Sequence, residues 1–243
     1  GRMPAFSVVI PAMNEAGNIG RLVVEIHETL TDDPPAEIIV IDDGSDDATA
    51  DELRAAMAQV PSLRVLRHDR RSGQSAAVRS GVRAARAEVI VTMDGDGQNP
   101  PADIPKLLAA LAGGPAGEPA LVNGWRTGRK ATGSRRLASR FANRVRQWAL
   151  KDECPDSGCG LKAFWRENYL ALPFFATMHR FMPALFGLYG RQTATVEVGD
   201  RARDAGASKY TNWKRGLDGA FDLLAFTWLR SRTRTPVATE IER

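Results

Sequence analysis

The sequence predicts an α/β fold with a mostly parallel central sheet flanked by helices, and three observations support this prediction. Short, apolar, β-branched runs alternate with helical patterns over the first hundred residues, which implies parallel strands joined by right-handed crossovers. Three of these runs end in polar residues, as expected at the carboxyl edge where open α/β sheets bind ligands. A length of 243 residues with 43% hydrophobic and 26% charged content suits one large globular domain.

The individual elements follow from local patterns, in chain order. Continuous apolar runs predict buried strands, and apolar residues spaced by three or four predict helices. The first part should contain strands at 6–10 (closed by Pro11), 37–41, 63–66 and 89–93, and helices over 18–30, 47–60 and 75–85. Glycines and prolines predict a loop at 113–119. Beyond it we expect strands at 121–123, 162–165 and 195–198, a basic helix over 135–150, short helices after 165, and a helix over 212–230.

The segment 94–98, Asp-Gly-Asp-Gly-Gln, is the most informative stretch of the chain. It directly follows a predicted buried strand, so Asp94 and Asp96 should project from the carboxyl edge of the sheet. The glycines allow close approach of a ligand, and Gln98 adds a neutral oxygen. Such an all-oxygen set suits Mg²⁺ or Mn²⁺, which usually hold substrate phosphates with one or two carboxylates. The alternative interpretation is a plain Asp/Gly turn that closes the strand.

Charge and motif content narrow the class of protein. The net charge is +4, and basic residues concentrate in 126–146 and from 230 onward, which favours phosphates, a membrane face or nucleic acid as partners. Nucleic acid is the weakest of these, because the basic segments lack interleaved aromatic residues. The two cysteines lack a second pair of zinc ligands, which argues against a zinc site. Two glycine-rich phosphate-binding motifs are also missing: no G-x-G-x-x-G follows the first strand and no G-x-x-x-x-G-K-[ST] occurs. Phosphates would therefore be handled through a metal ion.

Six segments, in this order, resemble family 2 glycosyltransferases of the GT-A fold. They are 8–15 (VVIPAMNE), 38–45 (IIVIDDGS), 94–100 (DGDGQNP), 156–162 (DSGCGLK), 179–183 (HRFMP) and 203–210 (RDAGASKY). The glutamine of the third segment resembles the polyprenyl-phosphate branch of the family, which includes the dolichyl-phosphate mannose synthases. The resemblance implies a catalytic domain over 4–211, followed over 212–243 by an amphipathic helix and a basic tail.

The resemblance also implies roles for particular residues. Those expected to line the nucleotide-sugar pocket are Pro11, Asn14, Glu15, Asp42 and Asp94. Asp94, Asp96 and Gln98 would hold the metal ion, which would bridge the two phosphates of a GDP- or UDP-linked sugar. Asp94, Asp96 and Arg203 are the expected catalytic residues. For Asp42 and Asp43, the alternative is a plain turn after a strand.

The acceptor implied by the resemblance is a polyprenyl phosphate, of the dolichyl or undecaprenyl type. Because a phosphate monoester is largely ionised at neutral pH, its oxygen needs positioning and charge compensation rather than a strong general base. By family position, the residues expected to bind this phosphate are Arg126, Arg140, Arg203 and Lys209; the alternative is a solvated basic helix face. Direct attack on the anomeric carbon would invert its configuration. His179 is expected either to support this side of the site or to be structural.

The helix expected over 212–230 raises the question of membrane contact. Its apolar residues are spaced by three or four and basic residues flank it, which fits an interfacial helix lying on anionic lipid; these apolar residues are Trp213, Leu217, Phe221, Leu224 and Trp228. The alternatives are packing on the catalytic domain or a dimer contact. No stretch reaches the roughly 18 apolar residues that a spanning helix needs. We therefore expect a cytoplasmic protein that associates peripherally with the membrane.

The leading hypothesis is a metal-dependent, inverting transfer of a sugar from a nucleotide-sugar to a polyprenyl phosphate. The alternatives are a family 2 transferase that acts on a soluble or saccharide hydroxyl, which would need a general base, and a nucleotide-sugar-binding protein without catalysis. The sugar, the base, the length of the lipid and the oligomeric state are not readable from one chain.

Overall fold

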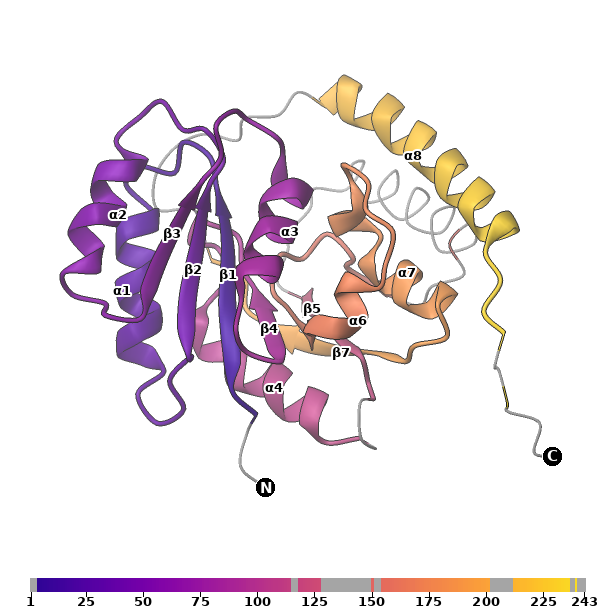
Figure 1. The fold of residues 1–243 in the computed structure, drawn as a ribbon, viewed down its shortest axis with the longest axis horizontal. Coiled ribbons are helices and arrows are strands. Elements are labelled where there is room, and N and C mark those ends of the chain that lie inside the picture. Colours follow the sequence, from indigo (N-terminus) through magenta and orange to yellow (C-terminus); the bar gives the residue numbers. More distant parts are fainter. Residues whose placement is uncertain are drawn as a thin grey trace.

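The computed structural model describes residues 4–114, 118–127, 150, 154–201, 212–236 and 239, with only the backbone over 212–220. Within these ranges one seven-stranded sheet has the order β3-β2-β1-β4-β6-β5-β7 (Figure 1). The strands are β1 (Phe6–Ala12), β2 (Glu37–Asp42), β3 (Leu63–Arg67), β4 (Val89–Thr92), β5 (Leu121–Arg126), β6 (Lys162–Trp165) and β7 (Thr193–Val198). Only β6 among them runs antiparallel to its neighbours, β4 and β5. The expected mostly parallel sheet is confirmed.

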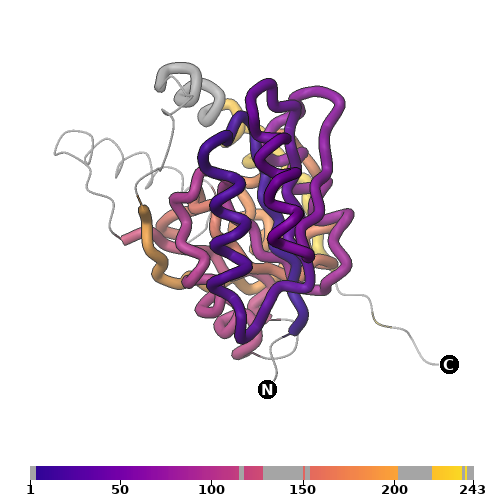
Figure 2. Tube along the Cα trace, turned by 90° about the vertical axis from the view of Figure 1, so that its left-hand side faces the viewer, coloured from indigo at the N-terminus to yellow at the C-terminus, as the bar shows by residue number. Residues whose placement is uncertain are grey.

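Helices cover both faces of the sheet. They are α1 (Ile19–Thr29), α2 (Thr49–Met57), α3 (Gln74–Ala84), α4 (Ile104–Ala112), α6 (Arg166–Leu170), α7 (Met182–Leu188) and α8 (Asn212–Arg232), with 3₁₀ turns at Pro101–Asp103 and Met178–Arg180. Helices α1, α2 and α4 pack on one face, and α1 and α2 lie side by side (Figure 2). Helices α3, α6 and α7, with part of α8, pack on the other. The result is a three-layer α/β arrangement.

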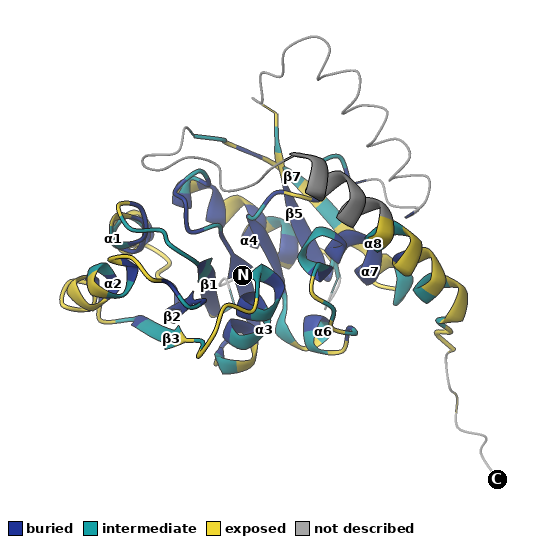
Figure 3. Cartoon of the chain, turned by 90° about the horizontal axis from the view of Figure 1, so that it is seen from above, coloured by how far each residue is buried: buried dark blue, intermediate teal, exposed yellow. Residues whose placement is uncertain are grey.

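The central strand β1 shows why the scaffold is rigid. Val8 and Ile10 face the α1 side and Val9 faces α3, as the alternation of side chains along a strand requires. All three are 0% exposed, and the strands appear as the buried centre of the molecule in Figure 3. Full burial of an aliphatic side chain of this size contributes about 1.5–3 kcal/mol. The strand ends, which carry the polar residues, are therefore held by a well-packed core.

Two predictions about elements need correction. The first strand was expected to close at Pro11, but β1 continues to Ala12 and pairs Pro11 with Ile41 of β2. This is possible because the ladder to β4 ends at Val9, and by alternation the missing N–H of Pro11 faces that side. Helix α4 was not predicted, although its apolar residues cover the same face as α1. The basic helix expected over 135–150 lies outside the described residues except at Leu150.

The C-terminal helix α8 has two different apolar faces. Phe226 is buried and stacks on Phe181 with ring centroids 5.5 Å apart. Phe221, Leu224 and Trp228 point away from the domain and are 75%, 70% and 63% exposed. The helix therefore packs on the domain and still presents an apolar stripe to its surroundings. Among the described residues, no helix has the length and apolar character required to span a bilayer.

Candidate active site

The expected metal-binding turn follows β4 and is held by its own polar groups. The Asp96 carboxylate accepts a hydrogen bond from the Gln98 N–H at 3.1 Å, and the Asp94 N–H donates to the Asn99 side chain at 3.2 Å. Gly97 has a φ of 78°, a conformation that residues other than glycine rarely adopt. The turn is therefore preformed, and Asp96 within it is only 7% exposed.

Sheet order brings this turn to the end of β1. Because β1 lies between β2 and β4, the carboxyl ends of these strands meet at one edge. A Cβ built on Gly95 would lie 3.0 Å from the carbonyl oxygen of Pro11, so a larger residue would separate the two segments. Pro11 and Asp94 also line the same small cavity. The structure therefore brings Pro11 together with the Asp94–Gln98 turn, whose binding of a metal ion stays a prediction.

The electrostatics of the turn suit a cation. Burial, and next the neighbouring Asp96 charge, raise the pKa of Asp94 to about 6, although Lys162 and Arg126 act in the opposite direction. A divalent cation would relieve this repulsion. Gln98 donates its Nε2 to the Arg201 carbonyl at 3.3 Å, which leaves Oε1 as its ligand atom.

The described residues contain no group of three or more His, Cys, Asp or Glu that could hold a metal ion. Two carboxylates and one amide oxygen nonetheless fit Mg²⁺ or Mn²⁺, because such ions commonly complete their coordination with substrate phosphates and water. The set Asp94, Asp96 and Gln98 thus fits a metal that binds together with a diphosphate.

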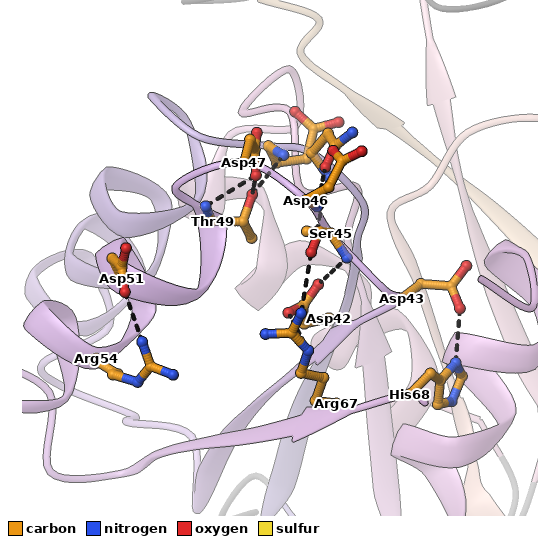
Figure 4. A network of polar contacts seen from close by, with 12 residues as sticks. Asp42, Asp43, Ser45, Asp46, Asp47, Thr49, Asp51, Arg54, Arg67 and His68 are labelled. Carbon is orange, nitrogen blue, oxygen red and sulfur yellow. Dashed lines mark hydrogen bonds and ion pairs between the residues drawn. The ribbon is translucent and has the colours of Figure 1, made fainter. Parts of the chain in front are cut away.

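Beside this turn, the loop after β2 forms a polar network (Figure 4). One carboxylate oxygen of Asp42 accepts the Ser45 N–H at 2.9 Å. The other, Oδ2, is buried without a hydrogen-bond partner and lies 3.6 Å from Nε of Arg67. A buried carboxylate oxygen that accepts no hydrogen bond is costly unless a ligand supplies one. Asp42 is therefore placed to bind a donor group of a ligand.

The two other predicted pocket residues hold this loop against β1. Asn14, at a φ of 53°, donates its N–H to the Ser45 hydroxyl at 2.9 Å and accepts the Asp46 N–H at 3.0 Å. Glu15 donates its N–H to the Thr49 hydroxyl at 2.9 Å. The structure gives both residues a role in shaping the pocket, while their contact with a nucleotide stays a prediction.

Sequence reasoning missed a second anchor, Asp43. Its carboxylate accepts the N–H groups of Ser72 and Gly73, each at 2.8 Å, and lies 2.7 Å from Nδ1 of His68. This fixes the start of α3, where Gln74 donates to the Asp94 carboxylate at 3.1 Å. The only signal in the sequence was the adjacency of Asp43 to Asp42, since the contact with Ser72 spans 29 residues.

Arg126, predicted to bind the acceptor phosphate, is already paired. Its Nε and Nη2 donate to the two oxygens of Asp156 at 2.7 and 2.9 Å, and its side chain is 7% exposed. Although burial acts against it, this pairing holds the pKa of Asp156 below its ordinary value. Arg126 and Asp156 thus form a clamp between β5 and the segment that precedes β6.

The remaining acceptor residues, Arg140, Arg203 and Lys209, lie outside the described residues. Arg201 is the last described residue before Arg203 and Lys209. Its N–H donates to the Gln98 carbonyl at 3.0 Å. Its guanidinium pairs with Glu25 at 2.8 and 3.0 Å. The chain after β7 therefore passes directly beside the metal-binding turn.

His179 lines the cavity beside Asp94 and stays neutral. Its Nδ1 lies 2.7 Å from the Ser75 hydroxyl, which also accepts the His179 N–H at 3.1 Å. Burial, and next the charges of Arg180 and Lys162, lower the pKa of His179 to about 3. A supporting role at the site remains a prediction, but the imidazole is not a base that titrates near neutral pH.

The lowered pKa of His179 predicts a pH-dependent stability. An unfolded histidine takes up a proton near pH 6.5, whereas the folded side chain does so only near pH 3. The unfolded state therefore binds more protons between these values, and the free energy of unfolding should fall by about 1–3 kcal/mol from pH 7 to 4.5. Urea unfolding should show this loss reduced in His179→Gln and unchanged in the exposed His27→Gln. Equal losses in all three proteins would contradict the prediction.

The mostly parallel sheet, with acids rather than a glycine-rich phosphate loop at its strand ends, agrees with the GT-A fold of glycosyltransferases. More particularly, the chain belongs to glycosyl transferase family 2, because the model of that family matches residues 7–170. This confirms the resemblance found in the sequence.

Curated relatives place the chain near transferases named for polyprenyl phosphates. It is 34% identical over 209 residues to a dodecaprenyl-phosphate galacturonate synthase of Rhizobium johnstonii, covering 84% of this chain and 61% of the relative. It is 34% identical over 206 residues to an undecaprenyl-phosphate 4-deoxy-4-formamido-L-arabinose transferase of Aeromonas hydrophila, covering 84% and 62%. The chain thus spans about three fifths of the length of these relatives.

Solved structures confirm the fold. A glucosyl-3-phosphoglycerate synthase of Mycobacterium tuberculosis, in complex with Mn²⁺, UDP-glucose and phosphoglyceric acid, matches with a TM-score of 0.69 at 23% identity, covering 97% of this chain and 81% of that one. The complex of the same synthase with Mg²⁺ and UDP matches with a TM-score of 0.68 at 24% identity, over 97% and 81%.

Proposed function

We propose that the protein transfers a sugar from a nucleotide-sugar to a polyprenyl phosphate, with inversion and with the help of Mg²⁺ or Mn²⁺. The observation that carries the proposal is the meeting of the Asp94–Gln98 turn with the Asp42 loop at one sheet edge. Relatives named for undecaprenyl and dodecaprenyl phosphate support the acceptor class, and a structural neighbour that binds UDP-glucose with Mn²⁺ supports the donor class.

The donor half of the site lies at the ends of β1, β2 and β4. Asp94, Asp96 and Gln98 would hold the metal ion, which would neutralise charge on the leaving diphosphate. Gln74 orients the Asp94 carboxylate, and Asp43 orients Gln74 by fixing the start of α3. The preformed turn means that the site needs little reorganisation when the donor binds.

The Asp42 end of the pocket suits a base that presents an N–H beside a carbonyl. Asp42 offers one unpartnered oxygen, Oδ2, with the Arg67 guanidinium beside it. One acceptor next to one donor matches the imide edge of uracil, where an N–H adjoins a carbonyl. The structural neighbour that binds UDP-glucose with Mn²⁺ supports uracil over guanine as this base. We therefore propose a UDP-sugar as the donor.

The acceptor half needs no general base. The ionised phosphate oxygen would attack the anomeric carbon directly, forming the new C–O bond as the bond to the diphosphate oxygen breaks. Arg126, Arg140, Arg203 and Lys209 are proposed to compensate the acceptor charge. Because Asp156 already neutralises part of Arg126, we propose that Arg140, Arg203 and Lys209 supply most of this compensation and that Arg126 mainly fixes the position of Asp156.

Transfer can be tested with chosen donors and acceptors. Purified protein is incubated with undecaprenyl phosphate and UDP-galacturonate, UDP-glucose or GDP-mannose, with Mn²⁺ or with EDTA. We expect a glycolipid product from a UDP-sugar, dependent on metal, and stabilisation of the protein against heat by UDP with Mn²⁺ but not by GDP. Product on a soluble saccharide but not on the lipid phosphate would support the hydroxyl-acceptor alternative. Donor binding without any transfer would support the catalytically silent alternative.

We also propose that residues 4–211 form the catalytic domain and that α8, within 212–243, contacts the membrane surface. The exposed stripe of Phe221, Leu224 and Trp228 is continuous with exposed Arg232 and Arg234 at the end of the helix. An apolar stripe beside cations suits the interface of an anionic bilayer. The two buried thiols, which form no disulfide, agree with a reducing compartment and hence with the cytoplasmic face.

The stripe gives a direct prediction for membrane binding. Replacing Phe221, Leu224 and Trp228 together by serine should weaken binding to phosphatidylglycerol-containing vesicles by about tenfold or more, because three large apolar contacts are lost. Vesicle co-sedimentation measures this, with Thr227→Ala/Ser231→Ala, two exposed polar positions of the same helix, as the control. Retained binding in the triple variant would exclude the stripe as the membrane contact.

A further inference from the structure

A buried lysine, Lys162, lies beneath the site and has no part in the chemistry above. It begins β6 and is 3% exposed. Its Nζ donates to Asn123 Oδ1 at 2.7 Å, to the Ser157 carbonyl at 3.0 Å, and to the Cys159 carbonyl. All three N–H groups of the ammonium are therefore satisfied, which a buried charge requires.

The partners of Lys162 identify what it holds. Two of them are carbonyls of the segment 154–160, which we call the 154–160 loop. The third, Asn123 of β5, is 1% exposed and donates its own Nδ2 to the Asp156 carbonyl at 2.9 Å. Lys162 and Asn123 thus bind the loop at Asp156, Ser157 and Cys159 from inside the protein. Removing the ammonium would leave buried carbonyls unpaired.

The same loop contacts both halves of the proposed site. Asp156 forms the bidentate pair with Arg126 on the acceptor side. Gly160 lies so close to the Asp94 carboxylate that a Cβ on it would be 2.3–2.4 Å from the three carboxyl atoms. The Gly160 carbonyl also accepts the Thr92 hydroxyl of β4 at 2.9 Å. A shift of the loop would therefore move the surroundings of Asp94 and Arg126 together.

We propose that Lys162 is a positioning residue for transfer: by fixing the 154–160 loop, it sets where the metal-binding carboxylate of Asp94 and the Arg126–Asp156 pair lie. The inference rests on the proposed function, because Asp94 is taken as a metal ligand. A lysine that merely stabilised the sheet would support folding without controlling the loop or the binding of metal and diphosphate.

The chain contains its own probe of the loop. Its two cysteines, Cys154 and Cys159, both lie in the loop, are not in a disulfide, and are 6% and 1% exposed. In Lys162→Met, which keeps the length of the side chain but removes its charge, both thiols should react about tenfold faster or more with a disulfide reagent. The affinity for UDP with Mn²⁺ should fall by about tenfold or more, and KM for the donor should rise. Lys106→Met, at a lysine that is 58% exposed on α4, is the matched control.

The outcomes separate the two claims. Thiols as slow as in the wild type would show that Lys162 does not hold the loop, and fast thiols with unchanged affinity for UDP and Mn²⁺ would show that the loop does not set Asp94; either result overturns the proposal. If wild-type protein itself binds no UDP with Mn²⁺, the proposed function fails, and this inference fails with it. Should Lys162→Met not fold, Asn123→Ser carries the same measurements, because it removes one partner of Lys162 and the bond to Asp156 without removing a charge.

Discussion

Asp96→Asn is expected to abolish most metal-dependent transfer while the protein remains folded. The substitution keeps the shape of the side chain, and the amide oxygen can still accept the Gln98 N–H that closes the turn. What it removes is a negative charge that would hold the metal ion against the diphosphate. Metal stabilisation of a leaving group is worth several kcal/mol, so kcat/KM should fall by about 10²–10⁴-fold.

The measurement is steady-state transfer at several Mn²⁺ concentrations, together with calorimetric titration of UDP in the presence of Mn²⁺. Asp69→Asn, at an exposed aspartate outside the site, is the control for loss of one charge. Because Asp94 is raised in pKa partly by Asp96, the Asn variant also relieves this repulsion, and its fold should not suffer. Transfer at the wild-type rate would show that Asp96 is not a metal ligand.

Gly160→Ala should lower the activity about as much as Asp96→Asn does, although it adds only one methyl group. Its Cβ would lie 2.3 Å from Cγ and 2.4 Å from both carboxylate oxygens of Asp94. The end of the Asp94 side chain is the part that can move, so we expect the carboxylate to turn away from its place beside the metal-binding turn. The protein should lose at most about 1–3 kcal/mol of stability. Its affinity for UDP with Mn²⁺ should fall by about 10²-fold or more, because a ligand is displaced.

The same loop offers a matched control in Gly158→Ala. A Cβ at Gly158 would find its nearest neighbour 3.9 Å away, at an oxygen of Asp156, which is an ordinary contact. This variant should bind and transfer like the wild type. The two alanine variants therefore differ only in whether the methyl group meets Asp94. If Gly160→Ala bound UDP and Mn²⁺ with wild-type affinity, the close packing of the loop on Asp94 would not be needed for donor binding.

Most of the fold could be predicted from local patterns. The apolar runs of the first four strands and the spacing of α1 through α3 are properties of neighbouring residues, so they are visible in the chain itself. The resemblance to family 2 glycosyltransferases was visible for the same reason, because its motifs include the strand ends at Asp42 and Asp94. The match to the family model confirmed it. Helix α4 escaped prediction because nearly every position in it is apolar, which hides the helical period.

The donor side of the candidate site was also predictable in part. The residues at the carboxyl ends of the neighbouring parallel strands converge as the expected topology requires; they are Pro11, Asn14, Asp42 and Asp94. Their different tasks do not follow from the topology. Asn14 holds a loop through backbone contacts, whereas Asp42 keeps one oxygen for a ligand, and both depend on the partner that each atom meets.

The sequence alone was thus enough to predict the α/β class, the positions of the first strands along the chain and the residues at the sheet edge, because periodicity and strand ends are local. Only the tertiary structure revealed that Lys162 holds a loop, that Gly160 touches Asp94, and that Arg126 is paired with Asp156. The contacts of Lys162 with Asn123, of Gly160 with Asp94 and of Arg126 with Asp156 join segments that are far apart in the sequence, and each depends on the exact packing of side chains. Hydrogen bonds and close approaches at that range are decided by three-dimensional packing, which no local pattern of residue types encodes.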